Sequence, residues 1–173
     1  MRRLGVIVAL GALLGMFGGA ATAAPALAGG RGDGWQFNDF GPGFTSDNCG
    51  FLVQGTQDVD NVFTKVLKTA DGSTIFLTTG SAKITFTNPA NGKNVSANTS
   101  GPAKTTVNAD GSLSFRATGP DPGDLSPAEQ QLTGLPGMFV SAGPLTGTVD
   151  ANNNLTSLTV QAHILVNICT ALS

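Results

Sequence analysis

Turn dipeptides at regular intervals are the feature that most restricts the fold of this chain. Asp71-Gly72, Asn91-Gly92 and Asp110-Gly111 are typical of β-hairpin turns, and the asparagine run 152–154 suits a fourth turn. We expect type I′ turns at the glycine sites, because that type needs positive φ at both central positions. The segments between the turns are rich in threonine, valine, phenylalanine and isoleucine. This spacing predicts consecutive antiparallel hairpins.

The segments between the turns also alternate between apolar and polar residues. The alternation is clearest in 82–88, 112–118, 145–149 and 155–166. It indicates an antiparallel sheet with one buried face and one polar face. The segment 73–79 is instead apolar on both faces, and we expect the N-terminal arm to cover its outer side.

The first 28 residues have the pattern of a secretory signal peptide. Arg2 and Arg3 provide the positive start, 4–17 is an uncharged apolar run, and Ala-x-Ala sites permit cleavage before Ala24 or Gly29. The apolar run is shorter than the roughly 20 residues that a membrane anchor needs. We therefore expect a secreted, extracellular protein with no membrane span in the mature chain.

Two cysteines, Cys49 and Cys169, flank the part of the chain that has strand character. In an oxidising compartment we expect them to form a disulfide, with two free thiols as the alternative. The bridge would bring the first and last strands together, as in a closed sheet. With about eight predicted strands, this favours an all-β fold, an up-and-down antiparallel barrel over 49–173. A β-sandwich is the alternative.

Two segments differ from the strands. Residues 29–48 are rich in glycine and aspartate with scattered aromatic residues, which indicates a flexible N-terminal arm. Residues 119–137 hold four prolines, too many for a sheet interior. Within them, Ser126-Pro127-Ala128-Glu129 is a helix-start pattern and Gly134 can end the helix. The sequence predicts one short helix inside a long connection of the length typical of lids.

Several short motifs resemble those of small exported β-proteins of actinobacteria that have no assigned function. They are Cys49-Gly50-Phe51, Lys68-Thr69-Ala70-Asp71-Gly72, Thr85-Phe86-Thr87-Asn88-Pro89, Asn108-Ala109-Asp110-Gly111 and the closing segment 167–173. At the level of fold, that group is similar to barrels of the allene oxide cyclase and dirigent type. The resemblance implies an eight-stranded antiparallel barrel but no activity, and no catalytic residue of those enzymes is carried over.

The residues of this chain indicate no reaction centre. His163 is the one histidine and falls with Gln161 on the polar face of its strand, where both would contact a ligand if that face lined a lumen. The series Asp150, Asn152, Asn154 lacks the glycine and glutamate of a calcium loop. The net charge of −2 provides no basic surface for nucleic acid. We assign no catalytic residue, metal or cofactor.

Three functional hypotheses follow from this pattern. The first is a secreted protein that binds a small apolar molecule in the barrel, with 119–137 as a lid that presents Leu132 and Leu135 inward. The second is a structural or interaction protein of the cell envelope, with a filled barrel. The third, ranked last, is a cyclase- or isomerase-like enzyme. The sequence leaves the ligand, the partner and the oligomeric state open.

Overall fold

The computed structural model describes residues 30–31, 33–39, 41, 43–161 and 163–173, and the predicted signal peptide lies outside these ranges. Both helices found there are short, α1 (Pro127–Thr133) and α2 (Ile168–Leu172). The strands, in chain order, are β1 (Gly30–Arg31), β2 (Trp35–Phe37), β3 (Gly43–Ser46), β4 (Val53–Lys68), β5 (Thr74–Thr87), β6 (Asn94–Asn98), β7 (Ala103–Val107), β8 (Leu113–Ala117), β9 (Asp121–Asp124), β10 (Met138–Ala142), β11 (Leu145–Val149), β12 (Leu155–Val160) and β13 (His163–Asn167).

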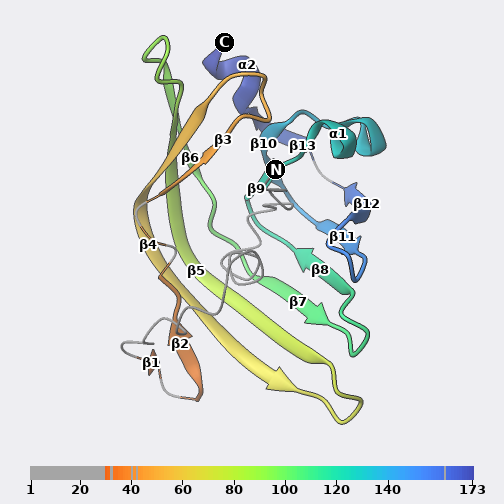
Figure 1. The fold of residues 1–173 in the computed structure, drawn as a ribbon. Coiled ribbons are helices and arrows are strands. Elements are labelled where there is room, and N and C mark those ends of the chain that lie inside the picture. The colour runs from red at the N-terminus through yellow and green to blue at the C-terminus, as the bar shows by residue number, and fades with distance from the viewer. Residues whose placement is uncertain (1–29, 32, 40, 42, 162) are drawn as a thin grey trace.

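The strands pair antiparallel, as the sequence predicts, and form two sheets (Figure 1). The larger sheet has the order β1-β2-β4-β5-β7-β8-β11-β12, with β3 also paired to β4 and β6 also paired to β5. The smaller sheet has the order β13-β10-β9. Strands β4 and β5 are the two longest strands and pair along most of their length. The two strands predicted at 73–79 and 82–88 are joined in the single strand β5.

The two sheets separate between β6 and β9. Strands β6 and β7 pair with successive parts of β5, and β8 is followed after a short break by β9. At this point Gly101 and Gly119 meet backbone to backbone, and a Cβ atom on Gly119 would lie 2.6 Å from the Cα of Gly101. Beyond the contact, β7 still pairs with β8, whereas β6 and β9 belong to different sheets.

The predicted closed barrel is not confirmed, because both sheets are open. Among the described residues, β1 and β12 end the larger sheet and β13 and β9 end the smaller one. The sandwich alternative fits the upper half of Figure 1, where β3-β4-β5-β6 and β9-β10-β13 lie on opposite sides of a shared core. A closed barrel would need β12 or β13 to pair with the first strands of the chain, and among the described residues β1, β2 and β3 pair only with one another or with β4.

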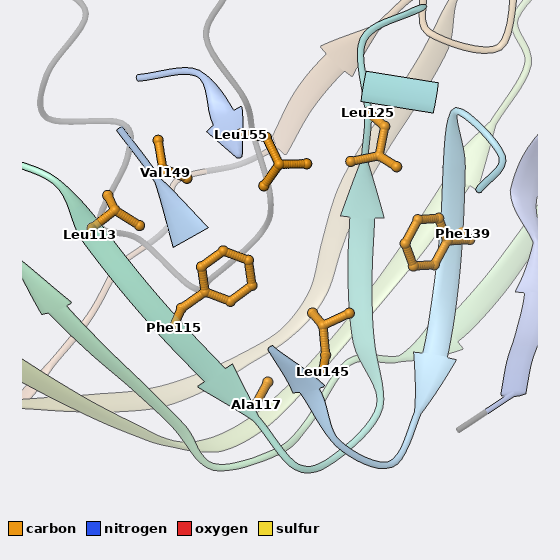
Figure 2. Packing of buried hydrophobic residues seen from close by; sticks show 8 residues of the cluster. All are labelled: Leu113, Phe115, Ala117, Leu125, Phe139, Leu145, Val149 and Leu155. Atoms are coloured by element: carbon orange, nitrogen blue, oxygen red, sulfur yellow. The ribbon is translucent and has the colours of Figure 1, made fainter. Parts of the chain in front are cut away.

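Two buried clusters hold these layers together. The β8–β11 cluster lies on the inner face of the larger sheet and is shown in Figure 2. It consists of Leu113, Phe115, Ala117, Leu125, Phe139, Leu145, Val149 and Leu155. The disulfide cluster lies between the two sheets beside α2. It consists of Val53, Ile84, Phe86, Ala97, Met138, Val140, Ile168 and Leu172.

The predicted turn sites are confirmed, but the expected turn type is wrong. At 69–73 only Gly72 has positive φ, and the Gly72 N–H donates to the Thr69 carbonyl while the Thr69 N–H donates to Ser73. Residues 108–112 have the same arrangement. This is a type I turn followed by a left-handed glycine, the usual three-residue hairpin loop. A side-chain hydrogen bond from Thr69 also lowers the pKa of Asp71.

The two segments that were expected to lie outside the sheets contribute strands. In the predicted N-terminal arm, β2 and β3 pair with successive parts of β4, so their backbone groups are bonded. In the predicted connection, β9 pairs with β10 despite Pro122. Proline is tolerated there because β9 is an edge strand that needs hydrogen bonds on one side only.

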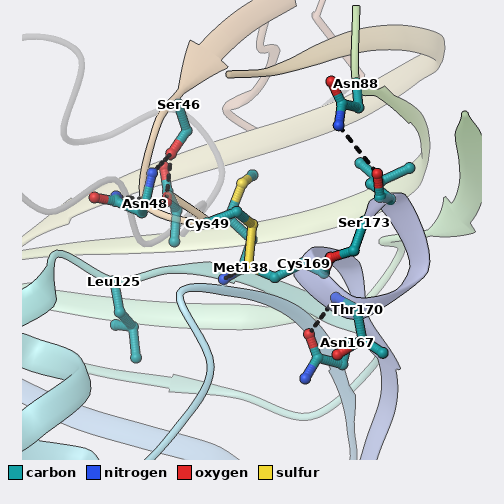
Figure 3. The surroundings of a disulfide bond; sticks show 12 residues. Ser46, Asn48, Cys49, Asn88, Leu125, Met138, Asn167, Cys169, Thr170 and Ser173 are labelled. Carbon is teal, nitrogen blue, oxygen red and sulfur yellow. Dashed lines mark hydrogen bonds between the residues drawn. A yellow bond between two sulfur atoms is a disulfide. The ribbon is translucent and has the colours of Figure 1, made fainter. Parts of the chain in front are cut away.

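The predicted disulfide is confirmed between Cys49 and Cys169, which are 120 positions apart (Figure 3). It joins the segment after β3 to α2, a helix that the sequence analysis did not predict. The Asn167 side chain accepts from the Thr170 N–H and begins α2. In the described part of the chain, neither helix has the length and hydropathy needed to cross a bilayer.

Candidate functional site

The three ligand-contact candidates of the sequence do not line an interior. Gln161 and His163 are exposed, and Leu132 on α1 is 57% exposed. The inward orientation expected for Leu132 is therefore wrong. Leu135, in contrast, packs against the β8–β11 cluster. The ligand-contact role of these residues stays a prediction, and we looked for a site elsewhere.

The 119–137 connection is part of the core. The predicted helix is confirmed: the Glu129 carboxylate accepts from the Ser126 N–H at 2.8 Å, and Gly134 ends α1 in a left-handed conformation. Leu125, just before α1, has no exposed surface and lies among the β8–β11 cluster (Figure 2). This segment therefore contributes to the hydrophobic core.

Polar bonds also tie the connection to the segment around the disulfide. The Asp124 carboxylate accepts from the Ser46 hydroxyl at 2.8 Å and from the Asn48 side-chain amide at 2.7 Å. The Gln130 side chain donates to the backbone carbonyl of Asn48 at 3.0 Å. Burial raises the pKa of Asp124, and the bonds from Asn48 and Ser46 oppose part of that effect. These bonds attach α1 and the residue Asp124 before it to the segment that runs from the end of β3 to Cys49.

A second carboxyl group, that of Asp121, is buried with one of its oxygen atoms lacking, within the described part of the chain, a hydrogen bond that would offset the loss of water. Its Oδ2 has no hydrogen-bond partner among the residues that the structure describes. Burial raises its pKa from 3.8 to about 7. In the register of the smaller sheet, Asp121 lies opposite Ser141 on β10, and Ser141 lies opposite Ile164 on β13. A buried acid of this kind can exchange a proton near neutral pH.

The outer face of the larger sheet carries a different pattern. We define the outer face as the side opposite the β8–β11 cluster. Directly opposed residues of seven strands form one row across this outer face. The next row, nearer the hairpin turns, contains directly opposed residues of six strands. The first row is Trp35, Lys65, Leu77, Lys104, Arg116, Thr146 and Thr159. The second row is Leu67, Ile75, Thr106, Ser114, Thr148 and Ser157.

Lys104 and Arg116 stand directly opposite each other on β7 and β8, and both are exposed. Their other direct neighbours in the row are Leu77 and Thr146, and the second row contains no charged residue. Two cations in this position repel each other and destabilise the sheet. The arrangement is therefore a cost to folding that an anion on the outer face would offset.

The alternation over 112–118 puts Arg116 on the polar face of its strand, but its pairing with Lys104 was not predicted. The missed signal is the symmetry of the two residues about the hairpin turn at Asp110-Gly111, which puts them opposite each other. Lys65 could not be found this way, because its place in the row depends on the pairing of two further strands, β4 with β5 and β5 with β7.

The described residues include no group of three or more histidine, cysteine, aspartate or glutamate side chains placed to hold a metal ion. The outer face is thus the arrangement with the clearest chemical preference, for negative charge. Comparisons of the chain with family models, with curated proteins and with solved structures found no match in any of the three.

Proposed function

We propose that this chain is an exported interaction protein that binds a phosphate-bearing polymer of the cell envelope on the outer face of its larger sheet. The observation that carries the proposal is the direct opposition of Lys104 and Arg116. This pair gives the fold nothing that threonine, the common residue of this face, would not give at lower cost. A negatively charged ligand supplies a reason for it.

The neighbours of the pair suit an extended anionic polymer. Lys65 adds a third cation in the same row beyond Leu77. Hydroxyl groups of Thr106, Ser114 and Thr146 stand beside the pair and can donate to phosphate oxygens. Guanidinium binds phosphate with two parallel hydrogen bonds, which makes arginine well suited to this ligand. A polymer lying along the row would contact several strands at once.

The rest of the molecule is consistent with a binding scaffold. The apolar-ligand hypothesis placed Leu132 and Leu135 toward a ligand. Leu132 is exposed, and Leu135 packs against the β8–β11 cluster. We therefore favour the interaction hypothesis of the sequence analysis. Export through the predicted signal peptide would explain the disulfide, because oxidising compartments preserve such bonds.

The test uses inorganic polyphosphate as the anionic probe and measures its affinity for the oxidised protein by fluorescence anisotropy. We expect binding at low ionic strength that weakens as salt is added, since it depends on charge. Replacing both Lys104→Gln and Arg116→Gln should weaken binding at least tenfold, which corresponds to about 1.4 kcal/mol.

The matched control is the double variant Lys68→Gln and Lys83→Gln, which removes the same charge from exposed positions outside the row. We expect its affinity to stay within about twofold of the original, because two lost cations far from the ligand matter little at moderate salt. Equal losses in both double variants would show that only the total charge matters. That result, or the absence of binding by the original protein at low salt, would refute the proposal.

A further inference from the structure

Strands β12 and β13, of six and five residues and separated by two positions, form the longest unprotected sheet edge in the described residues. Strand β12 pairs only with β11, and β13 pairs only with β10. The segment that contains them, 155–167, has no aspartate, glutamate, lysine, arginine, proline or glycine. It is therefore a run of 13 residues with high strand propensity and no residue that blocks pairing.

The other edges carry the usual protection. Strand β1 has two residues and β3 has four, and short edges pair weakly with another chain. Strand β9 contains Pro122 between two aspartates. Strand β6 follows directly after Lys93. Natural sheets protect their edges with short strands, proline and charge, and β12 with β13 has none of these.

We propose that the protein forms a homodimer in which β12 of one copy pairs antiparallel with β12 of the second copy. The unpaired N–H and C=O groups along β12 are the binding groups, and they recognise an extended strand. Antiparallel pairing of identical edges gives a closed two-fold dimer, because each residue contacts the symmetry-related position. The other end of the larger sheet is β1. If β12 paired with β1 of a second copy, it would find a strand of only two residues, which offers few backbone groups for pairing.

The side chains of β12 allow this pairing. Ser157 and Thr159 are exposed on the outer face, and Leu158 lies on the inner face against the β8–β11 cluster. In an antiparallel pair, directly opposed residues share a face. Keeping outer residues on the outer side therefore centres the two-fold axis on a residue of β12. A centre at Leu158 places Ser157 opposite Thr159 of the second copy, and no like charges meet.

This dimer would extend the larger sheet across both copies. The two-fold axis would run perpendicular to the sheet, so the outer faces of both copies would lie on the same side. Two rows with Lys65, Lys104 and Arg116 would then share one continuous surface. The proposal rests on the β12 edge alone and does not require that this surface bind a polymer.

The experiment measures the molar mass of the oxidised protein by sedimentation over a range of concentrations. We expect a dimer that dissociates on dilution. Thr159→Lys should shift the protein to monomer, because the lysines of the two copies become diagonal neighbours across the new interface and repel each other. Gln54→Lys is the matched control, since it adds the same charge at an exposed position on β4, between two paired strands. It should stay dimeric.

Hydrogen exchange of the unchanged protein provides a test that needs no variant. Amides of 157–160 should exchange faster on dilution, whereas those of β4 should not change. A protein that is monomeric at every concentration would overturn the proposal. So would a Thr159→Lys variant that folds and stays dimeric, or exchange in β12 that does not depend on concentration.

Discussion

At the scale of single residues, Asp121 couples folding to pH. Its pKa is raised to about 7 in the folded state from an ordinary value of 3.8, because burial disfavours the charged form. The stability this group provides is full below its unfolded pKa and is lost as pH rises through about 7. A shift of this size corresponds to about 4 kcal/mol.

We therefore predict that Asp121→Asn, which stays neutral at every pH, makes the protein more stable than the original at pH 8. Near pH 4 the two proteins should differ much less. Urea unfolding at several pH values measures this. Asp33→Asn, at an exposed turn position, is the control and should leave the pH dependence unchanged. If Asp121→Asn follows the original protein at every pH, the carboxyl group is not buried in solution.

At the scale of elements, the segment around α1 is part of the core. Leu125, just before α1, is fully buried, whereas Leu132, within α1, is 57% exposed. We predict that Leu125→Ala lowers the free energy of unfolding by about 2–5 kcal/mol, as cavity-forming substitutions do. Leu132→Ala should change it by less than about 0.5 kcal/mol. Thermal or urea unfolding distinguishes them, and equal effects would mean that α1 is oriented differently.

The elements that sequence predicts are the local ones. Hairpin turns such as 108–112 and the α1 helix depend on residues a few positions apart, and their patterns are visible in the sequence. The division of the larger sheet at Gly101 and Gly119 depends on contacts between segments far apart along the chain. For the same reason strand β9 was missed, since its pairing with β10 outweighs the local effect of Pro122. The resemblance to dirigent-type barrels stays a prediction.

The candidate site was less predictable than the fold. Alternation along 112–118 is enough to place Arg116 on the polar face. Its relation to Lys65 requires the pairing of β4, β5 and β7, which no local pattern determines. Leu132 was assigned inward because its helix was expected to close a barrel, and the sheets are open.

At the scale of the whole molecule, the disulfide joins the segment between β3 and β4 to helix α2. Closing a loop of 120 positions contributes about 4–5 kcal/mol in the chain-entropy model. We predict that Cys49→Ser and Cys169→Ser lower the melting temperature by similar amounts, because each removes the same bridge. Calorimetry of both variants measures this, with the reduced original protein as the reference. Clearly unequal effects would mean that the two sulfur atoms also act separately.

The central claim is that the Lys104–Arg116 pair is kept for binding and not for folding. Arg116→Glu tests it most directly, because this change puts a carboxylate opposite Lys104. Opposite charges across two strands stabilise a sheet, so stability should rise by up to about 1 kcal/mol. Polyphosphate affinity should fall at least tenfold in the same variant. A variant that binds as well as the original, or that loses stability together with binding, would contradict the account.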